Sequence, residues 1–202
     1  MKKTIYGMAA AGVILFSAFT AKEETFKADT KLSSLEWTGK KLTGEHSGII
    51  MLTAGEIKIS NDAVIGGTFE IDMASLVDKD LQDPAYKAKL EGHLKSAEFF
   101  DVAKFPKAKY EITSVTPLKD AKEGAFTHHV KGNLMLKDKT NPVEFDAVIK
   151  MADGKVACVG TATIDRSKFD VKYGSKSFFP EIGDKIIYDE FKVKFNVVAT
   201  KN

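Results

Sequence analysis

Apolar and polar residues alternate along most of this 202-residue chain. The clearest run is the last, residues 191–200, in which Phe191, Val193 and Phe195 alternate with polar side chains. A period of two is typical of a β-strand with one buried and one solvated face. Earlier runs share this period and predict further strands at 35–41, 47–53, 56–60, 66–73, 109–116, 130–136, 143–151 and 155–164.

Short segments rich in turn-forming residues separate these runs. Gly44, Gly55 and the pair Asn61-Asp62 mark three of them, and the polar residues 137–142 predict the turn of a hairpin. About eight to ten strands joined in this way favour an antiparallel sheet, closed as a barrel or folded as a sandwich. Since a strand of about ten residues rises roughly 33 Å, such a barrel would be tall, with a long interior.

One helical segment interrupts the strand pattern. Asp83 is suited to cap a helix that starts at Pro84, and Leu90 and Leu94 follow at helical spacing. We expect Gly92 to weaken or end this helix, because glycine is a poor helix former.

An aromatic stretch follows the helix directly. Ser96 offers a second helix cap, and Phe99, Phe100 and Phe105 come after it before Pro106 prevents continuation. A segment with so many aromatic side chains is not expected to stay exposed. We therefore predict a short helical lid at about residues 84–103, covering an apolar interior.

The N-terminus has the composition of an export signal. Lys2 and Lys3 precede an uncharged, apolar stretch at 5–19, and small residues surround a cleavage point near Ala21. We predict a signal peptide at 1–21 and a single domain at 22–202. Phe19 is a poor residue for that cleavage site, so an uncleaved membrane anchor is the alternative. Both readings place the domain outside the cytoplasm, most simply in a bacterial periplasm.

Charge and cysteine content narrow the range of functions. Without Lys2 and Lys3 the basic residues fall to 28 and equal the 28 acidic ones, and Arg166 is the sole arginine. A neutral surface of this kind argues against nucleic-acid binding. Cys158 is the only cysteine and falls within an alternating run, so we predict a small buried residue without a disulfide partner.

Four ordered motifs carry a resemblance to a known family. They are HLKSAEFFDV at 93–102 with Phe105-Pro106 and Tyr110, GNL at 132–134 with TNPV at 140–143, IDRSKF at 164–169, and IGD at 182–184. Together they resemble the YceI-like family of bacterial periplasmic lipid- or polyisoprenoid-binding proteins. The similarity extends over nearly all of the chain after the signal.

The resemblance implies an all-β fold, an extended antiparallel lipocalin-like β-barrel of about eight strands with the helical lid inserted. It also implies non-catalytic binding, storage or transport of a long-chain amphiphile such as a polyisoprenoid, an isoprenoid quinone or a fatty-acid-like lipid. No other cofactor is expected. Transient membrane contact is compatible with this reading, and the choice between monomer and homodimer stays open. Asp138-Lys139 and Asp170 stand where the family commonly has glycine, so we expect both turns to be reshaped.

Candidate ligand contacts follow from the alternating strands and the lid. For the barrel wall we predict Trp37, Met51, Phe69, Ile71, Tyr110, Ile112, Leu134, Phe145, Phe191 and Phe195. For the lid we predict Leu94, Phe99, Phe100 and Phe105. A solid hydrophobic core is the alternative at every wall position, and Trp37 could instead plug one end. Arg166 is the candidate headgroup contact, against a structural role in bonding loop carbonyls.

Two other functions are weighed against lipid binding. In the first, the barrel is filled and the exported protein acts through its surface. In the second, His46 and His93 meet in space and form a metal-dependent hydrolase, although the spacing shows no metal motif. His128 and His129 are adjacent on a predicted strand and would face opposite ways, so they do not form a chelating pair.

Overall fold

The computed structural model describes residues 22–119, 122 and 124–201. The predicted signal peptide at 1–21 lies outside these residues. The strands are β1 (Glu23–Ala28), β2 (Ser34–Lys41), β3 (Gly44–Ser60), β4 (Ala63–Asp78), β5 (Lys107–Pro117), β6 (His128–Leu136), β7 (Lys139–Ala152), β8 (Lys155–Asp165) and β9 (Ile187–Lys201). The helices are α1 (Pro84–Lys95) and two short 3₁₀ turns, η1 (Arg166–Phe169) and η2 (Gly183–Lys185).

The strands form a closed antiparallel barrel. The eight strands β2 to β9 pair in the order β3-β2-β9-β8-β7-β6-β5-β4, and the pairing of β3 with β4 closes the ring. The additional strand β1 pairs with the end of β3 and with the end of β9, beside the short β2. The expected all-β barrel of about eight strands is therefore confirmed, although β1 was not anticipated.

The strand β3 is much longer than its sequence pattern indicated. β3 contains 17 residues and runs through Gly55, which we had interpreted as a break between two strands. A Cβ at Gly55 would lie 2.6 Å from Phe69 Cδ1 on β4. Glycine is needed here for close packing between neighbouring strands, and not for a turn.

The hairpin turns are tight. Asn61 and Asp62 between β3 and β4, and Lys137 and Asp138 between β6 and β7, all have positive φ angles between 49° and 60°. Two successive residues of this kind make the two-residue hairpin turn that matches strand twist. The turn predicted at 137–142 thus occupies only its first two residues. Asp170 also has a left-handed conformation, with φ 59°, which aspartate tolerates in the absence of glycine.

The helix starts as expected and ends later. The Asp83 carboxylate accepts hydrogen bonds from the main-chain N–H groups of Ala85 and Tyr86. The helix continues through Gly92, which does not end it. Ser96 terminates α1 and does not begin a second helix; residues 96–105 form successive turns. Among the described residues, no helix has the length and hydropathy needed to cross a membrane.

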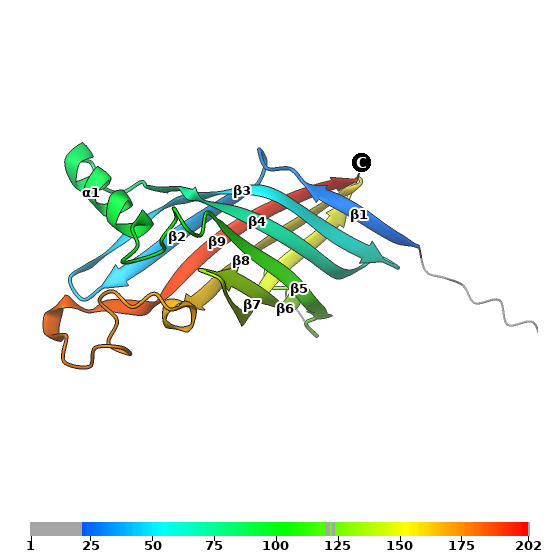
Figure 1. Cartoon of the computed structure of the whole chain (residues 1–202). Helices are drawn as coiled ribbons and strands as arrows, with labels where there is room; N and C mark the ends of the chain where they lie inside the picture. The colour runs from blue at the N-terminus through cyan, green and yellow to red at the C-terminus, as the bar shows by residue number, and fades with distance from the viewer. Residues whose placement is uncertain (1–21, 120–121, 123, 202) are drawn as a thin grey trace, which may run out of the picture.

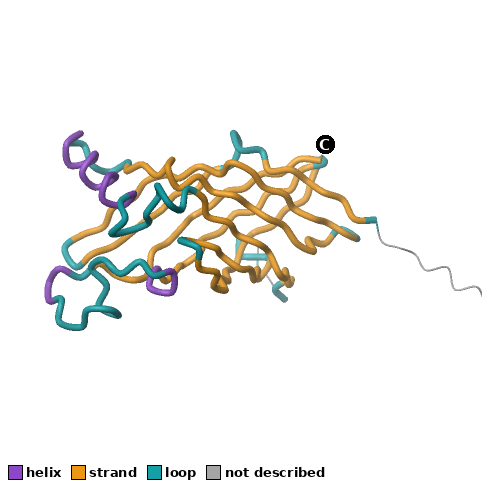
Figure 2. Tube along the Cα trace, viewed as in Figure 1, coloured by secondary structure: helices purple, strands orange, loops and turns teal. Residues whose placement is uncertain are grey.

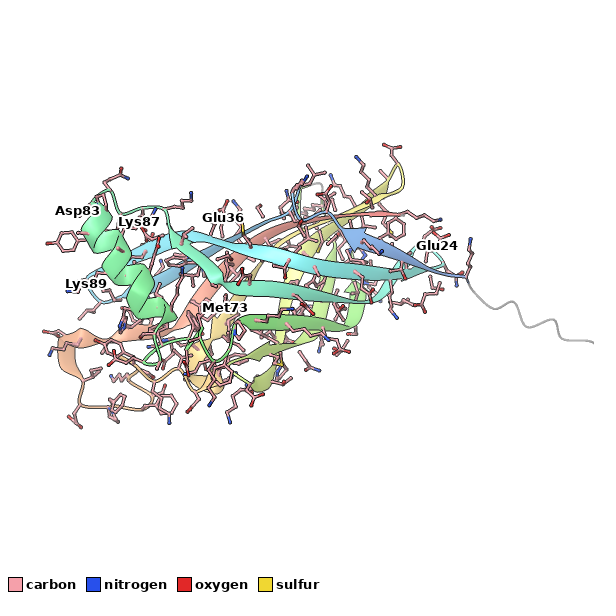
Figure 3. All side chains as sticks on the ribbon, turned by 45° about the horizontal axis from the view of Figure 1, so that its top comes forward. Glu24, Glu36, Met73, Asp83, Lys87 and Lys89 are labelled. Atoms are coloured by element: carbon pink, nitrogen blue, oxygen red, sulfur yellow. The ribbon has the colours of Figure 1, made fainter. Side chains whose placement is uncertain are left out.

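The two ends of the barrel differ (Figure 1). One end, which we call the α1 end, carries α1 with the turns after it, the β2–β3 turn, and the segment 166–186. The opposite end, which we call the far end, carries the two-residue turns after β3 and β7 and the connection between β5 and β6 (Figure 2). Figure 3 places Asp83 and Lys87 at the α1 end and Glu24 of β1 at the far end.

Candidate functional site

A cavity of about 370 Å³ lies inside the barrel. Its lining comes from the inward faces of β2 to β9, from α1 and from the turns after α1. Nine of the ten predicted wall residues are in this lining, namely Trp37, Phe69, Ile71, Tyr110, Ile112, Leu134, Phe145, Phe191 and Phe195. The volume falls within the usual range of small-molecule pockets, about 300–1,000 Å³.

Met51 was wrongly assigned to the wall. Its side chain is 61% exposed and points out of the barrel, whereas Ile50 and Leu52 on either side line the cavity. Residues 49–52 are all apolar, so alternation alone does not show which pair faces inward. The register of β3 against β2 and β4 decides it.

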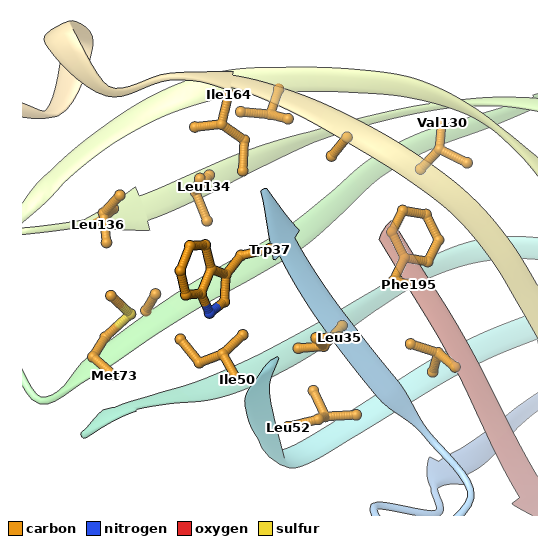
Figure 4. Close-up of a cluster of buried hydrophobic side chains, with 14 of the residues drawn as sticks. Leu35, Trp37, Ile50, Leu52, Met73, Val130, Leu134, Leu136, Ile164 and Phe195 are labelled. Carbon is orange, nitrogen blue, oxygen red and sulfur yellow. The ribbon is translucent and has the colours of Figure 1, made fainter. Parts of the chain in front are cut away.

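Trp37 is held in a fixed position inside the barrel. Its indole Nε1 donates a hydrogen bond of 3.2 Å to the carbonyl of Val77. A Cβ at Gly48 would lie 1.9 Å from that same carbonyl oxygen and 2.7 Å from the indole ring. In Figure 4 the indole lies among Ile50 and Met73, two cavity residues that the sequence analysis did not select. Both lie on the inward faces of their strands.

Three of the four predicted lid residues reach the cavity. Leu94, Phe99 and Phe100 belong to its lining, and the rings of Phe99 and Phe100 contact edge to face at 4.9 Å. Phe100 also lies 6.2 Å from the ring of Phe191 on β9. Phe105 does not line the cavity; its ring lies under the ammonium group of Lys104. The turns at 96–105 rotate it away from the position that a continuous helix would have given it.

Arg166 has the structural role that was considered as its alternative. Its guanidinium donates hydrogen bonds to four main-chain carbonyls, of Val171, Tyr173, Ile187 and Tyr188, at 2.8–3.2 Å. It also forms an ion pair of 3.3 Å with Asp189 and faces the ring of Phe99 at 5.2 Å. Because these acceptors already match its donors, Arg166 is a poor headgroup ligand. It anchors the segment 170–188 instead.

The polar lining of the cavity is concentrated at the α1 end. Lys40, Lys41, His46, His93 and Tyr188 contribute to the lining there, beside Arg166. Towards the far end, the lining consists of apolar side chains such as Ile57, Val64, Val130, Val156 and Val197. A guest with one polar end and one apolar end would therefore have a single favourable orientation.

The ionisable groups deeper in the barrel are neutral. Cys158 is partly buried, less completely than predicted, and burial raises the pKa of its thiol to about 12, so the thiol is protonated at neutral pH. Burial also raises the pKa of Tyr110 well above its usual value, and the Tyr110 hydroxyl donates a hydrogen bond of 3.0 Å to the carbonyl of Val143. Neither side chain would carry charge into contact with an apolar ligand at neutral pH.

The histidines do not form the pair that a hydrolase would need. His46 Nδ1 lies 3.0 Å from Asp80, whereas the His93 ring packs against Tyr173 and Phe99 at centroid distances of 4.4 and 5.8 Å. His129 on β6 contacts Asp146 on the outer surface. Each histidine has separate partners, although His46 and His93 both line the cavity.

Comparison with known proteins supports this architecture. The YceI-like domain family matches residues 26–199. The UPF0312 protein of Photorhabdus laumondii is 26% identical over 200 residues, which cover 92% of this chain and 91% of that protein. A UPF0312 protein of Pseudomonas fluorescens is 34% identical over 89 residues, a match that spans 41% of this chain and 44% of that relative.

Solved structures have the same fold at low sequence identity. BcnA of Burkholderia cenocepacia has a TM-score of 0.66 at 23% identity, covering 86% of this chain and 99% of its own. A polyisoprenoid binding domain from Saccharophagus degradans, implicated in plant cell wall breakdown, has a TM-score of 0.58 at 13% identity, covering 88% and 98%. Given the barrel, its cavity and a family match over residues 26–199, this chain belongs to the YceI-like domain family.

Proposed function

We propose that this protein binds one long-chain amphiphile, of the polyisoprenoid or isoprenoid quinone type, without catalysis. The tail would lie along the barrel, and the polar head would sit at the α1 end. The observation that carries this proposal is the internal cavity, whose lining is apolar except near α1.

The energetics favour such a ligand. Each methylene moved from water into an apolar cavity contributes about 0.8 kcal/mol, before the costs of association and ordering are subtracted. An apolar wall distinguishes ligands by length and shape far better than by headgroup. We therefore expect several amphiphiles of similar length to bind. The Saccharophagus degradans relative, described as a polyisoprenoid binding domain, supports an isoprenoid as the first candidate.

Exposed aromatic residues at the α1 end support exchange of the ligand with a membrane. Among the residues that the structure describes, five of the six large exposed aromatic side chains lie at this end: Tyr86, Tyr173, Phe178, Phe179 and Tyr188. One of them, Tyr188, also lines the polar end of the cavity. Aromatic rings are favoured at the boundary between lipid and water. We infer that this end touches a bilayer surface, and that the protein collects or delivers its ligand there after export to the periplasm.

Organic extraction of the purified protein, followed by mass spectrometry, tests ligand binding. Gly39→Phe is the test variant, because a Cβ at Gly39 meets no atom within 4 Å and Gly39 lines the cavity. The phenylalanine would fill space next to the polar end, and we expect at least a tenfold loss of co-purified lipid, roughly the effect of 1.4 kcal/mol. The neighbouring Thr38→Phe, outside the lining, should retain the lipid. A protein that is reproducibly free of lipid would overturn the proposal.

A further inference from the structure

His46, Asp78 and Asp80 form a compact cluster where the barrel meets α1. His46 lies near the start of β3, Asp78 is the last residue of β4, and Asp80 follows it in the connection to α1. One side-chain ligand atom from each residue lies within 4.8 Å of the other two. No local sequence pattern indicates this group, because it depends on the antiparallel pairing of Gly48 with Asp78.

Hydrogen bonds fix both carboxylates and leave one oxygen of each directed away from the main chain. Asp78 Oδ1 accepts a hydrogen bond of 2.8 Å from the N–H of Leu81. Asp80 Oδ1 accepts one of 2.9 Å from the N–H of Ser47, and its Oδ2 lies 3.0 Å from His46 Nδ1. Metal ligands are commonly oriented by second contacts of this kind.

The Asp78 carboxylate is unusual because it is buried without a full set of partners. The residue has 0% exposure, and Asp78 Oδ2 is buried with no hydrogen-bond donor among the described residues. A buried carboxylate oxygen without a donor or a cation is strongly unfavourable.

A third carboxylate lies beside the cluster. Glu91 of α1 accepts a hydrogen bond of 2.8 Å from the Asp78 N–H, which brings a third carboxylate close. Lys87 pairs with Glu91 at 4.0 Å, whereas no lysine or arginine within the described part of the chain forms an ion pair with Asp78 or Asp80. The two carboxylates therefore have no lysine or arginine as a direct partner.

We propose that His46, Asp78 and Asp80 bind one divalent transition-metal ion, with Zn²⁺ as the best candidate. One imidazole nitrogen and two carboxylate oxygens are a ligand set that Zn²⁺ accepts. The side chains of His46 and Asp80 are 27% and 37% exposed, so water can complete the coordination. Zinc ligands at bond lengths of about 2.0–2.2 Å would need the three atoms to move closer together, which small side-chain rotations achieve.

Such an ion would fix the base of the lid. Residues 79–83 connect β4 to α1, and Glu91 already joins α1 to Asp78 through the Asp78 main chain. A metal shared by β3, β4 and this connection would reduce the mobility of α1 relative to the barrel. The proposed site is independent of which lipid the cavity holds.

Calorimetric titration of untagged, chelator-treated protein with Zn²⁺ at pH 7.5 tests the site. We expect one ion per chain, and at least a tenfold weaker affinity in Asp78→Asn and in His46→Gln, the scale of losing a ligand or its support. Asp78→Asn retains the oxygen that accepts from Leu81, so the fold should be preserved. Circular dichroism checks this, and His46→Gln provides an independent variant.

His129→Gln is the matched control. His129 also contacts two carboxylates, but through different ring nitrogens, with Asp146 at Nδ1 and Glu144 at Nε2. These carboxylates cannot chelate one ion together with the imidazole, so Zn²⁺ affinity should be unchanged. Absence of Zn²⁺ binding, or binding that persists in Asp78→Asn and His46→Gln, would overturn the proposal. Lipid-free and lipid-loaded protein are titrated with Zn²⁺ separately. Because the proposed metal site does not depend on the lipid, a failure of lipid binding and a failure of Zn²⁺ binding can be told apart.

Discussion

The α1 end and the far end of the barrel are built on the same strands, but they differ in what the chain adds. The far end has two-residue turns after β3 and β7, and the cavity lining towards it is apolar. The α1 end has the lid, the buried Arg166 and most of the large exposed aromatics. The strands therefore provide the apolar tube, whereas the connections at the α1 end carry the helix and the turns that cover it.

The largest expected effect concerns the interior towards the far end, at Cys158. With a pKa of about 12, its thiolate fraction at pH 8 is more than about a thousandfold below that of an ordinary cysteine. We expect Ellman's reagent to react more slowly with the folded protein than with the unfolded chain by roughly that factor. Because the folded-state pKa of Cys158 is raised, its contribution to folding stability is complete below the unfolded-state pKa of about 8.5. This contribution is lost as pH rises towards the folded-state pKa. Rapid reaction in the folded state would show that the interior is wet.

Arg166 tests how firmly the α1 end is anchored. Arg166→Met would leave four main-chain carbonyls and Asp189 without their cationic partner. We expect a loss of about 3–5 kcal/mol in the free energy of unfolding, measured by urea denaturation. Lys168→Met, at an exposed position of the same short helix, is the control. A loss below about 1 kcal/mol would mean that the segment 170–188 is held by other contacts.

The exposed aromatics allow a direct comparison of the two ends. Replacing Phe178 and Phe179 by serine should weaken binding to lipid vesicles roughly tenfold, because their apolar area would no longer enter the interface. Phe126→Ser removes an aromatic of similar exposure from the other end and should change little. Flotation of the protein with vesicles of neutral and anionic lipids measures the difference. Equal effects at the two ends would contradict membrane contact at the α1 end.

The smallest expected effect comes from neighbouring histidines near the far end. A hydrogen bond to Asp146 raises the pKa of His129, so His129 supports folding below its unfolded pKa of about 6.5 and less as pH rises. Burial lowers the pKa of His128, so its contribution is present above the unfolded pKa of about 6.5 and is lost as pH falls below it towards the folded pKa. Replacing each by glutamine should change the pH dependence of the melting temperature in opposite directions. Shifts of the same sign would contradict these environments.

Much of the architecture could be predicted from local pattern. Alternation located β2 and β4 to β9, and Asp83-Pro84 located the start of α1, because each signal acts within a few residues. β1 was missed because its short sequence alternates weakly and it pairs only with the ends of β3 and β9. Gly55 was misread because a close approach between strands and a turn both require glycine.

The candidate site was predicted in part. Inward-facing residues on strands with one apolar face, such as Phe191 and Phe195, could be assigned from the sequence. Met51 could not, because both faces of β3 are apolar around it. Phe105 was misplaced because we expected a second helix where the chain forms turns. The partners of Arg166 come from another strand and a loop, and no local rule identifies them.

The sequence by itself determined an antiparallel β-protein with a capped helix and an aromatic segment after it, because periodicity and capping are properties of neighbouring residues. Only the tertiary structure decided which side chains face the cavity, that Arg166 anchors a loop, and that His46, Asp78 and Asp80 lie together. These outcomes depend on strand register and on the path of the connections. Both are set by contacts between residues far apart in the chain.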